Sequence, residues 1–166
     1  MLIRKHSAII AAASLVGLAI FSGSVLATDL TANASATIVA PLSIVENTPM
    51  DFGSISADAT NATNVTLDLV NTVTSADGAG VVPASGAASG DFTVSGAGNL
   101  AIAVSYTAGS LTGPGAAMAV SGFTDNAPAN LTAGTATFQV GADLAVGANQ
   151  TAGAYSGTYT ITVIYN

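Results

Sequence analysis

Alternation of apolar and polar residues at every second position is the feature that most restricts how this chain can fold. A period of two places successive side chains on opposite faces of an extended strand. The pattern is clearest at the end of the chain, where polar residues, most of them threonine, separate Tyr155, Gly157, Tyr159, Ile161, Val163 and Tyr165. We therefore predict a long final strand over residues 155–165, with the tyrosines on one face.

A second alternating segment lies near the start of the chain, over residues 32–44. Pro41 has no backbone N–H to donate to a neighbouring strand, so this segment is expected at a sheet edge or at a bend. Such a terminal strand pairs either within its own domain or with a neighbouring molecule. The apolar face that would make these contacts consists of Ala32, Ala34, Ala36, Ile38, Ala40, Leu42 and Ile44.

Shorter alternating stretches fill the region between these two segments. They cover residues 50–55, 64–73, 92–94, 100–106, 118–120 and 136–140, and residues rich in Gly, Pro and Asn separate them. Residues 74–90 are rich in Gly, Ala and Ser and are predicted to form a flexible excursion. No helical period appears after residue 27, and about eight short strands are typical of an antiparallel β-sandwich. The predicted fold class is therefore all-β.

The first 27 residues have the pattern of a cleavable secretion signal. Arg4 and Lys5 precede an apolar run over residues 8–21, and Val25 and Ala27 stand at the positions that signal peptidase reads. The run has about 14 residues, against the ~20 that a membrane-spanning helix needs. We expect residues 28–166 to form a single exported domain in the periplasm, at the cell surface or outside the cell, with no membrane span.

Charge limits the partners of this domain. Both basic residues lie in residues 1–27, together with the single His, and all nine acidic residues lie in residues 28–166. The side chains of the mature domain therefore carry a charge of −9, against −7 for the whole chain. Binding to nucleic acid depends on Lys and Arg that replace counterions at phosphates, so nucleic acid is excluded as a partner.

The same composition argues against catalysis. The mature domain has no imidazole base, no amine or thiol nucleophile and no cation to hold an oxyanion. Paired carboxylates could hydrolyse glycosides, but the acidic residues lie singly along the sequence. We expect no enzyme and no catalytic, cofactor or metal site. Without cysteine, stability must come from the core and from strand pairing.

Residues 34–44, followed by residues 50–55 and closed by residues 152–163, resemble a family of exported bacterial domains known as the domain of unknown function DUF4402. The final strand is also similar to that of chaperone–usher pilins, in which a glycine fourteenth from the end and a penultimate tyrosine recur. Gly153 and Tyr165 occupy these places here. The pilin resemblance implies an incomplete immunoglobulin-like sandwich that polymerises by donating its N-terminal strand.

Two functions of different classes follow from these observations. In the first, the domain is a structural subunit of a surface fibre, with copies of itself or related subunits and a periplasmic chaperone as partners. In the second, both terminal strands pair internally and the domain is a self-contained module that binds a glycan or an envelope protein. Tyr155, Tyr159 and Tyr165 fit either a packed core or a surface on which sugars stack.

Overall fold

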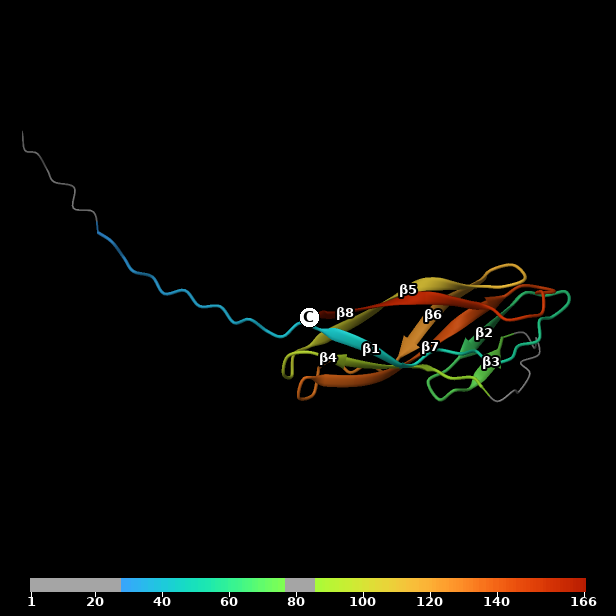
Figure 1. Ribbon diagram of the computed structural model, residues 1–166, viewed down its shortest axis with the longest axis horizontal. Helices are drawn as coiled ribbons and strands as arrows, with labels where there is room; N and C mark the ends of the chain where they lie inside the picture. The colour runs from blue at the N-terminus through green and yellow to red at the C-terminus, as the bar shows by residue number, and fades with distance from the viewer. Residues whose placement is uncertain (1–27, 77–85) are drawn as a thin grey trace, which may run out of the picture. The chain divides into compact units, whose positions relative to one another are not determined.

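A computed structural model describes residues 28–76 and 86–166, which contain eight antiparallel strands and no helix (Figure 1). This confirms the all-β prediction and its number of strands. The secretion signal and most of the predicted excursion, residues 77–85, lie outside the described residues. The strands are β1 (Ser43–Thr48), β2 (Thr63–Leu67), β3 (Val73–Ser75), β4 (Gly90–Ser95), β5 (Ile102–Thr112), β6 (Met118–Asp125), β7 (Thr135–Val146) and β8 (Ser156–Tyr165).

The chain divides into two compact units, residues 1–36 and residues 37–166, and every strand belongs to the second unit. In the first unit, residues 28–36 are exposed and contain no regular secondary structure. No helix in the described part of the chain is long and apolar enough to cross a membrane.

The strands pair into one continuous sheet in the order β1-β4-β7-β6-β5-β8, and β2 joins β3 to β7. The long strand β7 is central, since its first half pairs with β4 and its second half with β2, while β6 also pairs with it. The sheet curves so that β5 and β8 face β1 and β4 (Figure 1). This arrangement is barrel-like, so the two-sheet sandwich stays a prediction.

The interior holds two clusters of buried apolar side chains. The first centres on Val65 and Leu67 of β2 and on Leu144 of β7. In the second, Phe138 of β7 stacks against Phe92 of β4 with ring centroids 5.7 Å apart. Strand β7 contributes to both clusters, and seven of its twelve residues are buried. Its central position therefore explains why this strand is the best-covered element of the fold.

The N-terminal strand is the clearest departure from the sequence prediction. Residues 32–42 form no strand, and β1 begins only at Ser43. An extended segment needs partners for its backbone N–H and C=O groups, and the described residues supply no partner strand for this stretch, only the Tyr165 hydroxyl at the carbonyl of Ala40. The alternating pattern indicates a segment that could pair as a strand. The strand itself forms only where a partner strand is present.

The alternating stretch over residues 64–73 is likewise two strands rather than one. The Asp68 carboxylate accepts hydrogen bonds from the backbone N–H groups of Val70 and Thr72, at 2.9 and 2.7 Å. Asn71 adopts a left-handed conformation with φ of 64°. These contacts form a tight turn, and β3 returns antiparallel to β2. Residues 50–55 form no strand, and Asp51 makes an isolated bridge to Ala88.

The first testable prediction concerns the core. Leu144→Ala should lower the free energy of unfolding by about 2–5 kcal/mol, because it removes a fully buried side chain and leaves a cavity. Val70→Ala is the matched control, since Val70 is 76% exposed, and its effect should stay within about 0.5 kcal/mol. Urea unfolding of both variants checks this. Equal losses of stability would contradict the burial described for Leu144.

Candidate functional site

Strands β1, β3 and β8 each have one edge without a partner among the described residues, and those of β1 and β8 lie near each other at one end. Strand β1 pairs only with β4, and β8 pairs only with β5. The start of β1 lies beside the end of β8, because the Tyr165 hydroxyl donates a hydrogen bond of 2.8 Å to the carbonyl of Ala40. Strand β1 runs away from that point and β8 runs toward it, so the two free edges are antiparallel.

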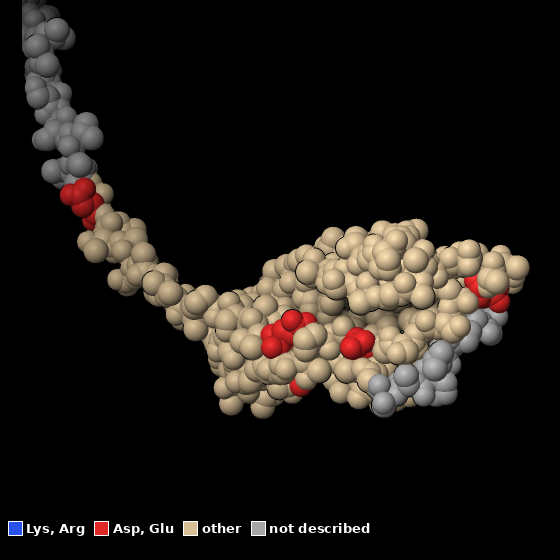
Figure 2. All heavy atoms as spheres, turned by 45° about the vertical axis from the view of Figure 1, so that its right-hand side comes forward, with Lys and Arg blue, Asp and Glu red and all other residues tan. Residues whose placement is uncertain are grey.

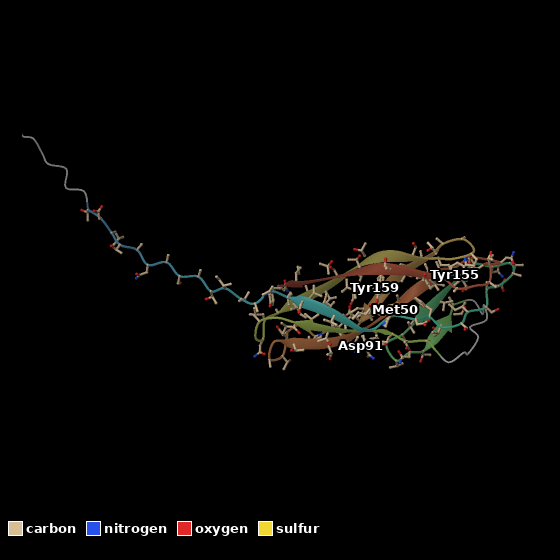
Figure 3. The ribbon with its side chains drawn as sticks, viewed as in Figure 1. Met50, Asp91, Tyr155 and Tyr159 are labelled. Atoms are coloured by element: carbon tan, nitrogen blue, oxygen red, sulfur yellow. The ribbon has the colours of Figure 1, made fainter. Side chains whose placement is uncertain are left out.

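An open groove of about 900 Å³ lies at the far end of these edges. Residues 50–57, which continue the chain beyond β1, line one side, and the beginning of β8 lines the other. Figure 3 shows Met50 on the first side and Tyr155 and Tyr159 on the β8 side. The floor is apolar and consists of Leu111, Met118, Val120, Leu144 and Val146.

Side chains along both free edges are poorly covered even where they face the interior. Ile44 of β1 is paired with Val94 of β4, so both side chains point to the same face of the sheet. Val94 is fully buried, whereas Ile44 is 39% exposed. Strand β8 has no buried residue along its length, and its interior-facing side chains are only half-buried. The interior of the sheet is therefore incompletely covered along the β1–β8 boundary.

Tyr159 crosses this interior from β8. Its ring packs beside Phe123, which in turn stacks on Tyr106, with centroid distances of 5.2 and 5.1 Å. The opposite wall has a glycine here, and a Cβ atom at Gly90 would lie 2.9 Å from the Tyr159 hydroxyl. Tyr159 therefore fills space that a larger residue on β4 would occupy.

The hydroxyl groups of Tyr106 and Tyr159 are buried without a hydrogen-bond partner among the described residues. Burial raises the pKa of Tyr159 to about 12, and the charge of Glu46 on β1 adds to the shift. Burial also raises the pKa of Tyr106, and the carboxylate of Asp125 contributes. An unpaired buried hydroxyl costs about 1–3 kcal/mol, which makes this part of the interior unusual for a packed core.

The other two tyrosines of the final segment have hydrogen-bonded hydroxyls. The Tyr155 hydroxyl donates to the carbonyl of Thr151 at 2.8 Å. The Tyr165 hydroxyl, besides donating to Ala40, accepts a hydrogen bond of 2.6 Å from the backbone N–H of Ala97. Tyr165 thus ties the last residues of β8 to the chain just before β1.

Acidic residues serve the turns instead of gathering into a site. The Asp58 carboxylate accepts hydrogen bonds from the backbone N–H groups of Thr60 and Asn61, which hold the pKa of Asp58 below its ordinary value. Asp51 and Asp125 likewise accept from backbone N–H groups two residues further on. Within the described residues, no three acidic groups come together as metal ligands would. Figure 2 shows acidic side chains scattered over a surface without basic ones.

The family model described as "Domain of unknown function (DUF4402)" matches residues 42–165, which include every strand of the fold. The chain belongs to the DUF4402 family. Neither a curated protein nor a solved structure matches it. The match begins at Leu42, so the exposed alternating segment before it lies outside the part of this DUF4402 domain that the family model covers.

The structure brings together only some of the residues singled out from the sequence. Ala40 meets Tyr165, Leu42 packs against the second cluster, and Ile44 lies in β1. Gly153 precedes β8 with φ of 146° and sits against Pro114. Ala32, Ala34, Ala36 and Ile38 are exposed and belong to no strand.

Sequence reasoning missed the opposite wall of the groove in this DUF4402 domain. Phe52 and Ile55 line it although residues 50–55 form no strand, and Glu46 faces the interior because it pairs with the buried Phe92. The period of two could have placed Glu46 and Ile44 on one face. That this face points inward depends on the pairing with β4, which no local pattern reveals.

The second prediction compares two tyrosine hydroxyls. Tyr165→Phe should destabilise the domain by about 1–3 kcal/mol, because it leaves the Ala97 N–H without its partner. Tyr159→Phe is the matched control, and it should leave stability unchanged or raise it, since its hydroxyl has no hydrogen bond to lose. Denaturant unfolding at neutral pH separates the two. A larger loss for Tyr159→Phe would contradict the hydrogen bonding described here.

The third prediction concerns alkaline pH. A tyrosine with a raised pKa in the folded state stabilises that state fully below the unfolded pKa of about 10. This contribution from Tyr159 should be lost as the pH rises from about 10 toward the folded value of about 12. Melting temperatures measured from pH 8 to pH 12 should fall more steeply for the unchanged domain than for Tyr159→Phe. Parallel curves would show that the hydroxyl is not buried.

Proposed function

We propose that this protein is an exported structural subunit of a surface fibre, and that the N-terminal segment of one subunit completes the sheet of the next. The observation that carries this proposal is the pair of free antiparallel edges of β1 and β8, with a groove of apolar floor at their far end. On this proposal, the barrel-like sheet is an incomplete immunoglobulin-like, pilin-like sandwich. An added strand would supply main-chain hydrogen bonds to both edges and cover the half-buried side chains.

The exposed N-terminal segment has the length and the pattern that the edges require. Strand β8 has 10 residues, and residues 28–41 provide 14 residues outside any strand. A strand rises about 3.3 Å per residue, so this segment can span the whole of β8. Ile38 is 97% exposed and Leu30 is 89% exposed, an unfavourable state for large apolar side chains that insertion would relieve.

The geometry of a single subunit disfavours insertion of its own N-terminal segment between β1 and β8. The carbonyl of Ala40 is bound by Tyr165 at the end of β8, and the chain enters β1 three residues later. Self-insertion would need a tight reversal around Pro41 and would place the segment parallel to β8. A neighbour's segment can run antiparallel to β8 instead. Such head-to-tail exchange does not close on itself and gives a linear fibre.

A glycan- or protein-binding module is the second candidate. The groove volume of about 900 Å³ falls within the usual range of ligand pockets, and two tyrosines line it. In that case the domain would be a stable monomer whose melting temperature rises with ligand. The fibre proposal is preferred because it also accounts for the unpaired backbone edges along β1 and β8.

The fourth prediction tests strand donation on residues 28–166. Ile38→Asp should reduce polymer by at least about tenfold, because the inserted strand would have to bury an unpaired carboxylate. Val39→Asp is the matched control, since residue 39 lies on the opposite, outward face of the same segment, and it should assemble normally. Light scattering after size-exclusion chromatography, together with heat-sensitive ladders on gels, provides the measurement.

Circular dichroism spectra at low temperature should show that both variants keep the β-sheet fold, because Ile38 and Val39 lie outside the core of their own subunit. The melting temperature should fall only for Ile38→Asp, because its sheet edges stay uncovered. If the unchanged protein is a stable monomer, the fibre proposal fails and the binding module takes its place. Equal loss of polymer in both variants would indicate that added charge, rather than the inward face of the segment, controls assembly.

A further inference from the structure

We propose a specific register for the exchanged strand: Ile38 of one subunit lies opposite Gly157 of the next, with the two strands antiparallel. This inference rests on the proposed strand donation and identifies which residues meet. It follows from a match between the side-chain sizes along the two segments. The sequence alone could not supply it, because it depends on which face of β8 borders the groove.

The acceptor face of β8 has one gap. Its interior-facing row runs Tyr155, Gly157, Tyr159, Ile161, Val163 and Tyr165, and glycine is the only member without a side chain. A Cβ atom at Gly157 would collide with the carbonyl of Ser110 on β5, so β8 itself can supply no side chain at this position. Gly157 is exposed in the groove wall, and its partner on β5 is Leu111, which contributes to the apolar floor. A large apolar side chain above Gly157 would therefore be covered from below and flanked by Tyr155 and Tyr159.

The side-chain sizes of the donor segment are the opposite of those on β8, with one large residue among small ones. Between Ala32 and Ala40, the apolar face has a single large residue, Ile38, and the other positions are alanine. With Ile38 opposite Gly157, Ala36 lies opposite Tyr159, the residue that already crosses the interior toward Gly90. The remaining facing pairs are Ala34 with Ile161, Ala32 with Val163 and Leu30 with Tyr165. Small residues thus face large ones over nearly the whole strand.

Neighbouring registers lose this match. A shift of two residues in either direction places Ile38 opposite Tyr155 or Tyr159 and an alanine above Gly157. The first contact is overpacked, and the second leaves a gap in the floor of the groove. A shift of one residue turns the polar face of the donor, including Thr37 and Ser35, toward the apolar interior. Side-chain size therefore selects one register among those that backbone pairing alone permits.

Disulfide trapping can test the register, because the chain contains no cysteine of its own. In the proposed register, Ser35 lies directly opposite Thr160, and both side chains point outward. Directly opposed residues of antiparallel strands have Cα atoms about 4.5–5.5 Å apart, within disulfide range. Residues offset by two positions are about 7–8 Å apart, beyond that range.

The fifth prediction uses mixtures of two single variants of residues 28–166, one carrying Ser35→Cys and the other an acceptor cysteine. Under mild oxidation, Thr160→Cys should form the mixed disulfide dimer at least about fivefold faster than Thr158→Cys or Thr162→Cys. These two acceptors are matched controls, because all three threonines are exposed on the same face of β8. Non-reducing gels with mass spectrometry identify the linked residues.

The outcomes separate the register from the function on which it rests. Preferential linkage through Thr158→Cys or Thr162→Cys would show strand exchange in a register shifted by two residues and overturn this inference. Heat-sensitive ladders without linkage at any of the three positions would show that the donor does not run antiparallel along β8. The absence of both ladders and linkage would overturn the proposed function itself.

Discussion

The unsatisfied edges of β1 and β8 are the constraint on which the rest of this structure depends. Each edge presents a row of backbone N–H and C=O groups, and most proteins cover, charge or shorten such edges. Here the edges are antiparallel, and a groove with an apolar floor lies between the start of β8 and the residues that follow β1. The half-buried tyrosines of β8 and the interior-facing but exposed Ile44 both follow from the same incomplete coverage. A strand along this boundary would complete the sheet and the core together.

Aromatic side chains explain why the donor segment can be built from alanine. A groove with a deep floor would need large donor residues to fill it. In this domain Tyr159 and Phe123 already occupy much of the interior near β8, and Tyr155 stands at the mouth of the groove. The donor then needs little side-chain volume except above Gly157. In the proposed exchange, the small alanine side chains of the donor segment would therefore complement the large tyrosine side chains of β8.

The sequence predicted those parts of the fold in which local pattern and tertiary partner agree. Strand β8 begins within one residue of its predicted position, since it alternates over most of its length and β5 pairs with it on both sides of one bulge. Prediction failed for residues 32–42, where a suitable pattern has no partner strand. The orientation of Glu46 toward the interior also escaped prediction, because it is fixed by pairing with Phe92, far along the chain. Long-range pairing, which decides inward and outward faces, is the information that local periodicity lacks.

Electrostatics cannot select the partner in the proposed fibre. Residues 28–166 contain no basic side chain, so contacts between copies of this part of the chain would contain no side-chain salt bridge, and its nine acidic groups would repel those of a neighbour. Screening limits this repulsion to about 8 Å at physiological ionic strength, and Asp29 is the single acidic residue in residues 28–42. The donor segment can therefore approach the groove with little charge of its own. Association would rest on backbone hydrogen bonds, which any strand can make, so the sizes of Ile38 and its alanine neighbours would carry the specificity.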